Sequence, residues 1–140
     1  MKRSNPTVAD YMTKTPHSIG ADQPISRARA LMREHGVRHL PVLEGGHLVG
    51  IVTDRDLAAT EAVDEDKREA LRVDDAMTPF PYVAAPSAPL AEVARAMAAG
   101  KFGAALVADA GRVVGVFTTT DAMRALADAL EARPERRQHA

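Results

Sequence analysis

The chain has 140 residues, enough for one compact domain or two very small ones. Hydrophobic residues make up 46% of it and charged residues 26%, which is typical of an ordinary globular protein. The net charge of −1 and the aromatic content of 4% argue against a nucleic-acid-binding surface, since phosphate backbones attract basic surfaces and unpaired bases stack on aromatic rings. The absence of cysteine excludes disulfides, thiol catalysis and thiolate metal sites.

The N-terminal sequence does not resemble a signal peptide. Lys2 and Arg3 are followed by Ser4, Asn5 and Pro6, where a signal peptide has an apolar run. No segment has the run of apolar residues that a transmembrane helix needs. We therefore expect a cytoplasmic protein.

The sequence contains an internal repeat. Residues 8–57 align with residues 73–122 without an insertion, and thirteen of these 50 pairs are identical. None of the identical pairs is alanine, so biased composition does not explain the match. The repeat predicts two copies of one supersecondary unit around a pseudo-twofold axis. We expect copy one at 8–64, copy two at 73–131, a solvated linker at 65–72 and a disordered tail at 132–140.

Each copy begins with a predicted helical turn, at Val8–Met12 and Val73–Met77. An extended segment follows and runs to Ile19 or Val83. A longer helix then starts at Pro24 or Pro89, since proline is tolerated in the first turn of a helix.

Glycine predicts where these longer helices end, at Gly36 and Gly100. Apolar residues recur along them at helical spacing. In copy one these are Ile25, Ala28 and Met32; in copy two they are Leu90, Val93, Ala94 and Met97.

Two short apolar runs close each copy and predict a hairpin. They are 37–43 and 48–52 in copy one, 104–108 and 113–117 in copy two. The predicted order in each copy is β-α-β-β-α, so the fold class is α/β, with the two repeats packed as one module because neither covers its own sheet.

Thr53 and Thr118 follow the hairpins and are expected to be N-caps of a final helix. In each copy an aspartate comes three residues later, at Asp56 and Asp121. Thr-x-x-Asp is a variant of the capping box, so the pattern has a purely structural interpretation as well as a functional one.

The repeated motifs resemble those of the CBS domain superfamily. They are Val-x-x-x-Met-Thr at the start of each copy, Val-Arg-His-Leu-Pro-Val at 37–42, and Gly-h-x-Thr-x-x-Asp at 50–56 and 115–121, where h is apolar. Two sets in register resemble a tandem CBS pair, or Bateman module, of the stand-alone bacterial signal-transduction type. The resemblance implies adenine-nucleotide binding.

The residue types of the last motif fit that chemistry. The Thr hydroxyl and the first N–H groups of a helix favour an anion such as phosphate. A carboxylate one turn later can accept two hydrogen bonds from the vicinal diol of a ribose. The motif glycine either leaves space above the strand for a ring or permits close packing of the strand.

In the family this Asp binds ribose, while the Thr and nearby basic groups meet phosphate. The candidate nucleotide-binding residues are therefore Arg38, His39, Thr53, Arg55 and Asp56 in copy one, and Gly103, Ala104, Thr118, Thr120 and Asp121 in copy two. The copies are not equivalent, because the cations of copy one are matched by Gly103, Ala104 and Thr120. Copy two has more space for adenine and fewer partners for phosphate.

We expect a non-catalytic sensor of energy or metabolite state that binds AMP, ADP or ATP and acts in trans on another protein, with NAD and S-adenosylmethionine as alternative ligands.

The resemblance also implies a homodimer, through the final helix at 121–131 and the apolar faces of the repeat helices, such as Leu90, Val93 and Met97. Two rivals remain: a ligand-independent dimerisation or interaction module, and an enzyme or metal carrier with an unrecognised site. No metal site is expected, because Gly36 interrupts the i, i+4 pair His35 and His39.

Overall fold

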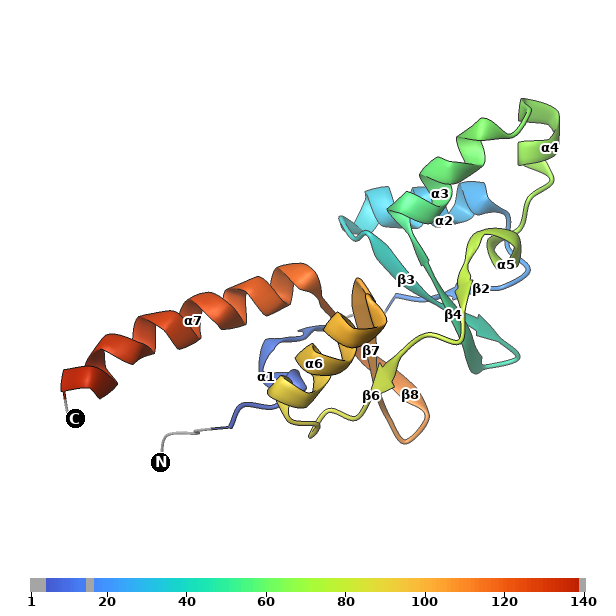
Figure 1. Cartoon of the computed structure of the whole chain (residues 1–140). Coiled ribbons are helices and arrows are strands. Elements are labelled where there is room, and N and C mark those ends of the chain that lie inside the picture. The colour runs from blue at the N-terminus through green and yellow to red at the C-terminus, as the bar shows by residue number, and fades with distance from the viewer. Residues whose placement is uncertain (1–4, 15–16, 139–140) are drawn as a thin grey trace. The chain divides into compact units, whose positions relative to one another are not determined.

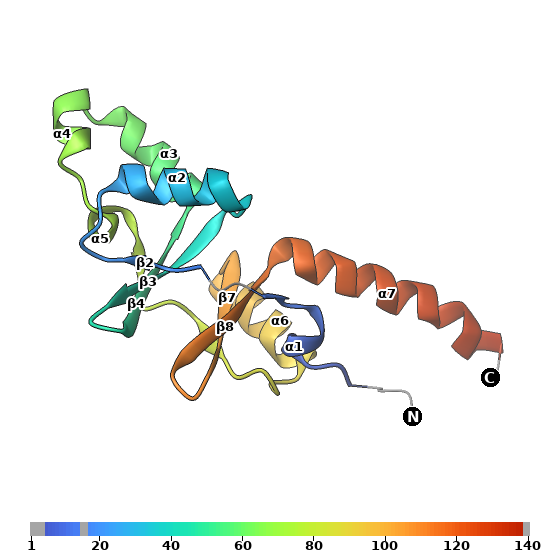
Figure 2. The same ribbon diagram turned by 180° about the vertical axis from the view of Figure 1, so that it is seen from behind.

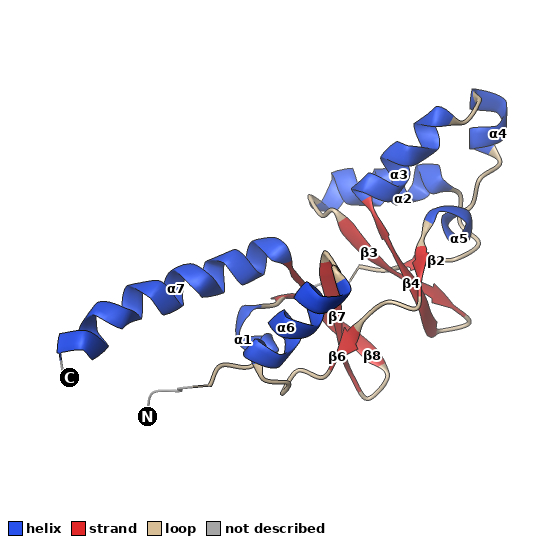
Figure 3. Cartoon of the chain, in the orientation of Figure 1, coloured by secondary structure: helices blue, strands red, loops and turns tan. Residues whose placement is uncertain are grey.

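The computed structural model describes residues 5–14 and 17–138, which divide into two compact units. The copy-one unit consists of Thr15–Pro81, and the copy-two unit combines Met1–Lys14 with Tyr82–Ala140. Each unit has its own four-stranded sheet with helices packed against it (Figure 1, Figure 3). The α/β class and the two repeated β-α-β-β-α cores are confirmed.

The sheet of the copy-one unit has the order β2-β3-β4-β5. Strand β2 (Ile19–Gly20) is parallel to β3 (His39–Glu44), which forms an antiparallel hairpin with β4 (His47–Thr53). Strand β5 (Thr78–Pro79) adds antiparallel to β4. The helices are α2 (Ile25–His35), α3 (Asp54–Ala59), the 3₁₀ turn η1 (Thr60–Ala62), α4 (Glu65–Glu69) and α5 (Val73–Ala76).

The sheet of the copy-two unit repeats this plan in the order β1-β8-β7-β6. Strand β6 (Val83–Ala84) is parallel to β7 (Ala104–Asp109), which forms a hairpin with β8 (Arg112–Thr118). The helices are α1 (Val8–Tyr11), α6 (Leu90–Gly100) and α7 (Thr119–Gln138). Both views place α1 against β8 and the start of α7 (Figure 1, Figure 2).

Each sheet takes its outer strand from the other copy. Strand β1 (Thr13–Lys14) belongs to copy one by sequence but pairs with β8, with Thr13 opposite Val116. Strand β5 belongs to copy two but pairs with β4, with Thr78 opposite Ile51. The compact units therefore differ from the sequence repeats, because each copy gives its first helix and strand to the other copy's sheet.

The motif glycines make this exchange possible. A Cβ on Gly50 would lie 2.5 Å from Met77 Sδ and 2.8 Å from the Thr78 carbonyl oxygen, and a Cβ on Gly115 would lie 2.6 Å from Met12 Sδ. A side chain at either position would force these neighbours to move, so glycine permits the close approach. The expectation that these glycines leave space for a ligand ring is therefore wrong, and the close-packing alternative holds.

Three predicted boundaries need correction. Helix α2 ends at Gly36 as predicted, with a φ of 64°, but α6 includes Gly100 and the left-handed residue is Lys101, with a φ of 56°. Lys101 occupies the repeat position of Gly36.

Helix α7 continues to Gln138, so the disorder predicted from 132 is wrong for 132–138, while 139–140 lie outside the described residues. The predicted linker contains helix α4.

The apolar faces of the repeat helices are covered within each unit. Leu90, Val93 and Met97 belong to the core of the copy-two unit and are at most 8% exposed, so their predicted role in a dimer interface is wrong. The exposed large apolar side chains include three on α7, at Met123, Leu126 and Leu130. Within the described residues, no helix has the length and hydropathy needed to cross a bilayer.

Candidate functional site

The Thr53 motif caps helix α3 in the copy-one unit. Thr53 ends β4 in an extended conformation (φ −117°, ψ 164°), and its hydroxyl accepts a hydrogen bond from the Asp56 N–H at 3.1 Å. In return the Thr53 N–H donates to Asp56 Oδ2 at 2.9 Å. This is a complete capping box, so the structural interpretation of Thr-x-x-Asp is confirmed in copy one.

The other predicted residues of copy one lie at the same end of the sheet. His39 pairs with Thr53 across the β3–β4 hairpin, and the Asp54 N–H donates to the Arg38 carbonyl oxygen at 3.0 Å. The Arg38 side chain is 82% exposed and only 4.0 Å from the Asp54 carboxylate, a contact that contributes little in water. Arg55 is exposed in the first turn of α3. All five residues predicted for copy one are thus neighbours.

One oxygen of the Asp56 carboxylate is available at this end. Oδ2 holds the Thr53 N–H, whereas Oδ1 has no hydrogen-bond partner among the described residues. The side chain is partly exposed. Because a carboxylate has about four acceptor positions, Asp56 can serve as a helix cap and accept hydrogen bonds from a ligand at the same time.

The Thr118 motif of the copy-two unit has the same backbone arrangement. Ala104 pairs with Thr118 across the hairpin, and the Thr119 N–H donates to the Gly103 carbonyl oxygen at 3.3 Å. The Thr118 N–H donates to Asp121 Oδ2 at 2.9 Å. Thr120, the counterpart of Arg55, is exposed. The five residues predicted for copy two are therefore also neighbours.

The Asp121 carboxylate differs from that of Asp56 because it is buried and fully bonded. Asp121 is 1% exposed. Its Oδ2 accepts from the backbone N–H and, at 3.2 Å, the hydroxyl of Thr118. Its Oδ1 accepts from the Thr13 hydroxyl at 3.1 Å and from Arg124 Nη2 in an ion pair. Four donors therefore occupy the four acceptor positions of this carboxylate.

Sequence reasoning missed Thr13 and Arg124 as neighbours of Asp121. Arg124 lies one helical turn after Asp121, a spacing that favours an ion pair. Thr13 is 108 residues away in sequence and reaches Asp121 only because β1 joins the copy-two sheet. The spacing that the two copies share does not indicate which sheet β1 joins.

A second side-chain hydrogen bond ties the N-terminal segment to α7. The Tyr11 hydroxyl donates to Asp128 Oδ2 at 2.5 Å. This hydrogen bond raises the pKa of the Tyr11 hydroxyl, and desolvation and the negative charge of Asp128 add to the increase. The corresponding positions of the copy-one unit hold Ala76 and Val63, which cannot form such a bond.

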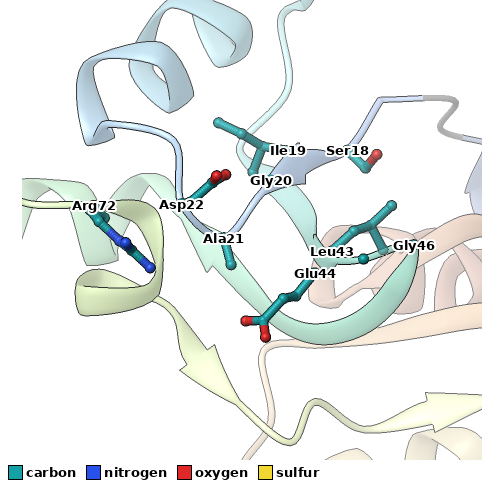
Figure 4. A pocket seen from close by; sticks show the side chains of 10 residues that line it. Ser18, Ile19, Gly20, Ala21, Asp22, Leu43, Glu44, Gly46 and Arg72 are labelled. Carbon is teal, nitrogen blue, oxygen red and sulfur yellow. The ribbon is translucent and has the colours of Figure 1, made fainter.

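A cavity of about 490 Å³ lies at the opposite end of β4 from Thr53 (Figure 4). It is lined by 18–22, 43–46 and Arg72, and none of the predicted site residues takes part. Arg72 donates to both carboxylate oxygens of Asp74, at 3.1 and 2.5 Å, and this pairing lowers the pKa of the Asp74 carboxyl. The cation at this cavity is thus already paired.

The histidines at i, i+4 spacing are arranged separately. His35 stacks face to face on His17, with ring centroids 3.6 Å apart, while His39 lies in β3. Over the part of the chain that the structure describes, no group of three or more histidine or acidic side chains is placed to hold a metal ion.

The family model of the CBS domain matches the chain twice, over residues 8–62 and 73–128. The chain belongs to the CBS domain family. Its two matches make it a tandem CBS pair, as the repeat predicted. The predicted resemblance is confirmed.

Among curated relatives, the CBS pair is 35% identical over 115 residues to an inosine-5′-monophosphate dehydrogenase of Korarchaeum cryptofilum, a match that covers 81% of the chain and 22% of the enzyme. A homoserine O-acetyltransferase of Methanococcoides burtonii is 33% identical over 84% of the chain and 24% of the enzyme. The chain thus spans less than a quarter of the length of both relatives.

Two solved structures resemble the CBS pair over nearly their whole length. CBSX2, a protein of Arabidopsis thaliana, has been solved in complex with AMP; that structure is 33% identical, with a TM-score of 0.73 over 89% of this chain and 98% of the other. The CBS pair of protein MJ0100, in complex with 5′-methylthioadenosine and S-adenosyl-L-methionine, is 28% identical, with a TM-score of 0.79 and the same coverage.

Proposed function

We propose that this CBS pair is a regulatory module that binds an adenine nucleotide and catalyses no reaction itself. The observation that carries the proposal is the Asp56 carboxylate, which caps α3 through one oxygen and leaves Oδ1 available among exposed cations. The ligands of similar CBS pairs, AMP in CBSX2 and two adenosyl compounds in MJ0100, support an adenosyl ligand.

The copy-one residues divide the ligand between them. Asp56 Oδ1 accepts hydrogen bonds from the ribose diol, and the Thr53 end of α3 faces the phosphate. Arg38, His39 and Arg55 surround the phosphate chain and favour AMP, ADP or ATP over the less anionic alternatives, NAD and S-adenosylmethionine.

The copy-two residues form a second and weaker binding site for the same ligand. Gly103 and Ala104 present little side-chain bulk to adenine. Thr120 is a hydroxyl donor for phosphate, and Thr118 becomes one when its hydroxyl turns away from Asp121 Oδ2. Asp121 is the proposed ribose acceptor, but each hydroxyl of the diol reaches it only by replacing one of the four donors that it already holds.

Ligand binding regulates by shifting the population of module shapes, since a ligand that prefers one shape stabilises it. The changed surface is recognised by another, cytoplasmic protein in trans.

We also propose that the module is a homodimer, with Met123, Leu126 and Leu130 of α7 in the interface, because exposed apolar residues at helical spacing favour a partner. Light scattering at micromolar concentration should give the mass of two chains, and a monomer would refute the dimer.

The ligand test is calorimetry with ATP, AMP and adenosine on the intact chain. Arg55→Ala should weaken ATP or AMP roughly tenfold through the loss of one charge-assisted contact, and leave adenosine nearly unchanged. Thr120→Ala, at the matched exposed position of copy two, should have a smaller effect. Equal losses for ATP and adenosine would show that Arg55 does not contact phosphate.

The ribose contact has an independent test in the ligand. A 2′,3′-dideoxy nucleotide should bind about 10- to 100-fold more weakly than its parent, as should the parent nucleotide to the Asp56→Ala variant. Equal affinity of the two nucleotides would overturn the ribose role. If no adenosyl ligand binds the wild-type chain, the ligand-independent interaction module replaces this proposal.

A further inference from the structure

We propose that Thr13 is a positioning residue that competes with the ribose for Asp121, so that nucleotide binding in the copy-two unit loosens strand β1. The inference rests on the proposed function, since it concerns how the second binding site is regulated. It connects ligand binding to β1, the strand that copy one contributes to the copy-two sheet.

Asp121 has no acceptor position to spare. Its two oxygens hold two donors from Thr118, one from Thr13 and one from Arg124, and the side chain is 1% exposed. A ribose diol brings two more donors to a carboxylate whose capacity is about four hydrogen bonds. Each ribose hydroxyl that binds therefore requires that an existing donor leave.

The two neutral hydroxyl donors, those of Thr118 and Thr13, leave Asp121 most easily, and the Thr118 hydroxyl then becomes a donor for phosphate. Removing the Thr118 N–H would leave a helix-end donor without an acceptor, and removing Arg124 would separate an ion pair from a buried carboxylate. Thr13 is neutral and exposed, and its 3.1 Å bond can be replaced by one to water. Its departure also uncovers Oδ1, the oxygen farther from the helix cap.

The hydrogen bond of Thr13 to Asp121 helps to hold strand β1 in place. Strand β1 has only two residues and pairs with β8 at Val116 and Gly115, and its side chains are exposed. The preceding helix α1 is anchored more strongly, because Val8 is completely buried and its N–H donates to the Ala88 carbonyl oxygen at 2.9 Å. Loss of the Thr13 bond should therefore loosen β1 and leave α1 docked.

Strand β1 is also the point where the chain leaves the copy-two unit for the copy-one unit. A ligand-dependent change there alters how firmly the last residues of the N-terminal segment are held to β8. The copy-one unit contains the matched position but not the bond: Thr78 pairs with Ile51, and no hydrogen bond joins it to Asp56 in the described residues. Thr78 is thus an internal control for Thr13.

The test measures the affinity for AMP of the intact chain carrying Asp56→Ala. In this variant Asp121 of the copy-two unit is the remaining proposed ribose acceptor. In this background Thr13→Val should tighten AMP about three- to tenfold, because AMP no longer displaces the hydroxyl. Thr13→Ser restores the donor and should return the affinity to that of the background. Thr78→Val should leave it unchanged.

Hydrogen exchange gives a second readout that a purely structural role would not produce. AMP should speed exchange of the amides of β1 in the background chain, and should have no such effect in Thr13→Val. Unchanged or weaker AMP binding by Thr13→Val, or slower β1 exchange with AMP, would overturn the proposed competition between Thr13 and the ribose. Loss of all AMP binding from Asp56→Ala would also overturn it, whereas failure of the wild-type chain to bind AMP would refute the proposed function itself.

Discussion

The copy-one and copy-two units are built on one plan, with the same strand order and a Thr-x-x-Asp cap at the same end of each sheet. They differ in the surroundings of the aspartate. Asp56 is partly exposed and has one oxygen available, whereas Asp121 is buried and holds four donors. The aspartate of the motif therefore has an available acceptor oxygen in the copy-one unit and none in the copy-two unit.

The cause of the difference lies outside the motif. Thr13 and Arg124 saturate Asp121, while the residue of copy one that matches Arg124 is Ala59 and Thr78 makes no bond to Asp56 among the described residues. A family motif thus indicates where a ligand can bind, but neighbouring residues determine whether its carboxylate is free to do so.

The largest expected effect tests this contrast through stability. Asp121→Ala should lower the free energy of unfolding by about 2–4 kcal/mol, because it removes a buried carboxylate that satisfies a helix cap and an arginine. Asp56→Ala, the matched change at the open carboxylate, should cost only about 0.5–1.5 kcal/mol. Chemical denaturation measures both values.

Equal losses for the two aspartate variants would contradict the contrast between the units. Asp121→Asn provides a finer control, since it keeps the size of the side chain but removes the charge that Arg124 requires. The free energy of unfolding of Asp121→Asn should lie between those of the wild type and Asp121→Ala.

A second prediction tests what the units share. Gly50→Ala and Gly115→Ala should each destabilise the chain by about 1–3 kcal/mol, because the new methyl group collides with a methionine of the exchanged segment. The pair Gly50→Ala and Met77→Ala should cost less than the sum of the single changes, since removing the Met77 side chain relieves one collision. Additive losses in this double-mutant cycle would show that Met77 is not the obstacle.

The smallest predicted effect concerns alkaline pH and the copy-two unit. The hydrogen bond to Asp128 raises the pKa of Tyr11 above its ordinary value of 10.0, so folding favours the protonated hydroxyl. The resulting stability is present below about pH 10 and is lost as the pH rises through the raised pKa. Tyr11→Phe should therefore show a shallower loss of melting temperature above pH 10 than wild type. A wild-type slope in Tyr11→Phe would rule out this contribution.

Much of the local structure was predictable from the sequence. The hairpins, the long helices after Pro24 and Pro89 and the caps at Thr53 and Thr118 follow from local periodicity and capping residues, which act within a few positions of the chain. The repeat also placed the candidate residues of each copy at one end of a sheet. These features depend on neighbouring residues alone.

The exchange of β1 and β5 was not predictable in this way. Each strand has two residues, and the sheets of the two copies offer it edges of nearly the same pattern. Local sequence cannot distinguish two such edges, because the choice depends on contacts between residues far apart in the chain. The roles of Gly50, Gly115 and Thr13 depend on that choice and were therefore misjudged or missed.

The exchanged strands also set the order in which the units can form during synthesis. All strands of the copy-one unit lie within residues 19–79, so its sheet can assemble before the second hairpin has been made. The copy-two sheet needs Thr13 and Val116 together, at opposite ends of the chain. Because closing a long loop costs entropy before its contacts form, the N-terminal segment should remain undocked on the ribosome until β8 emerges. Nascent chains should therefore gain resistance to proteolysis first in the copy-one unit.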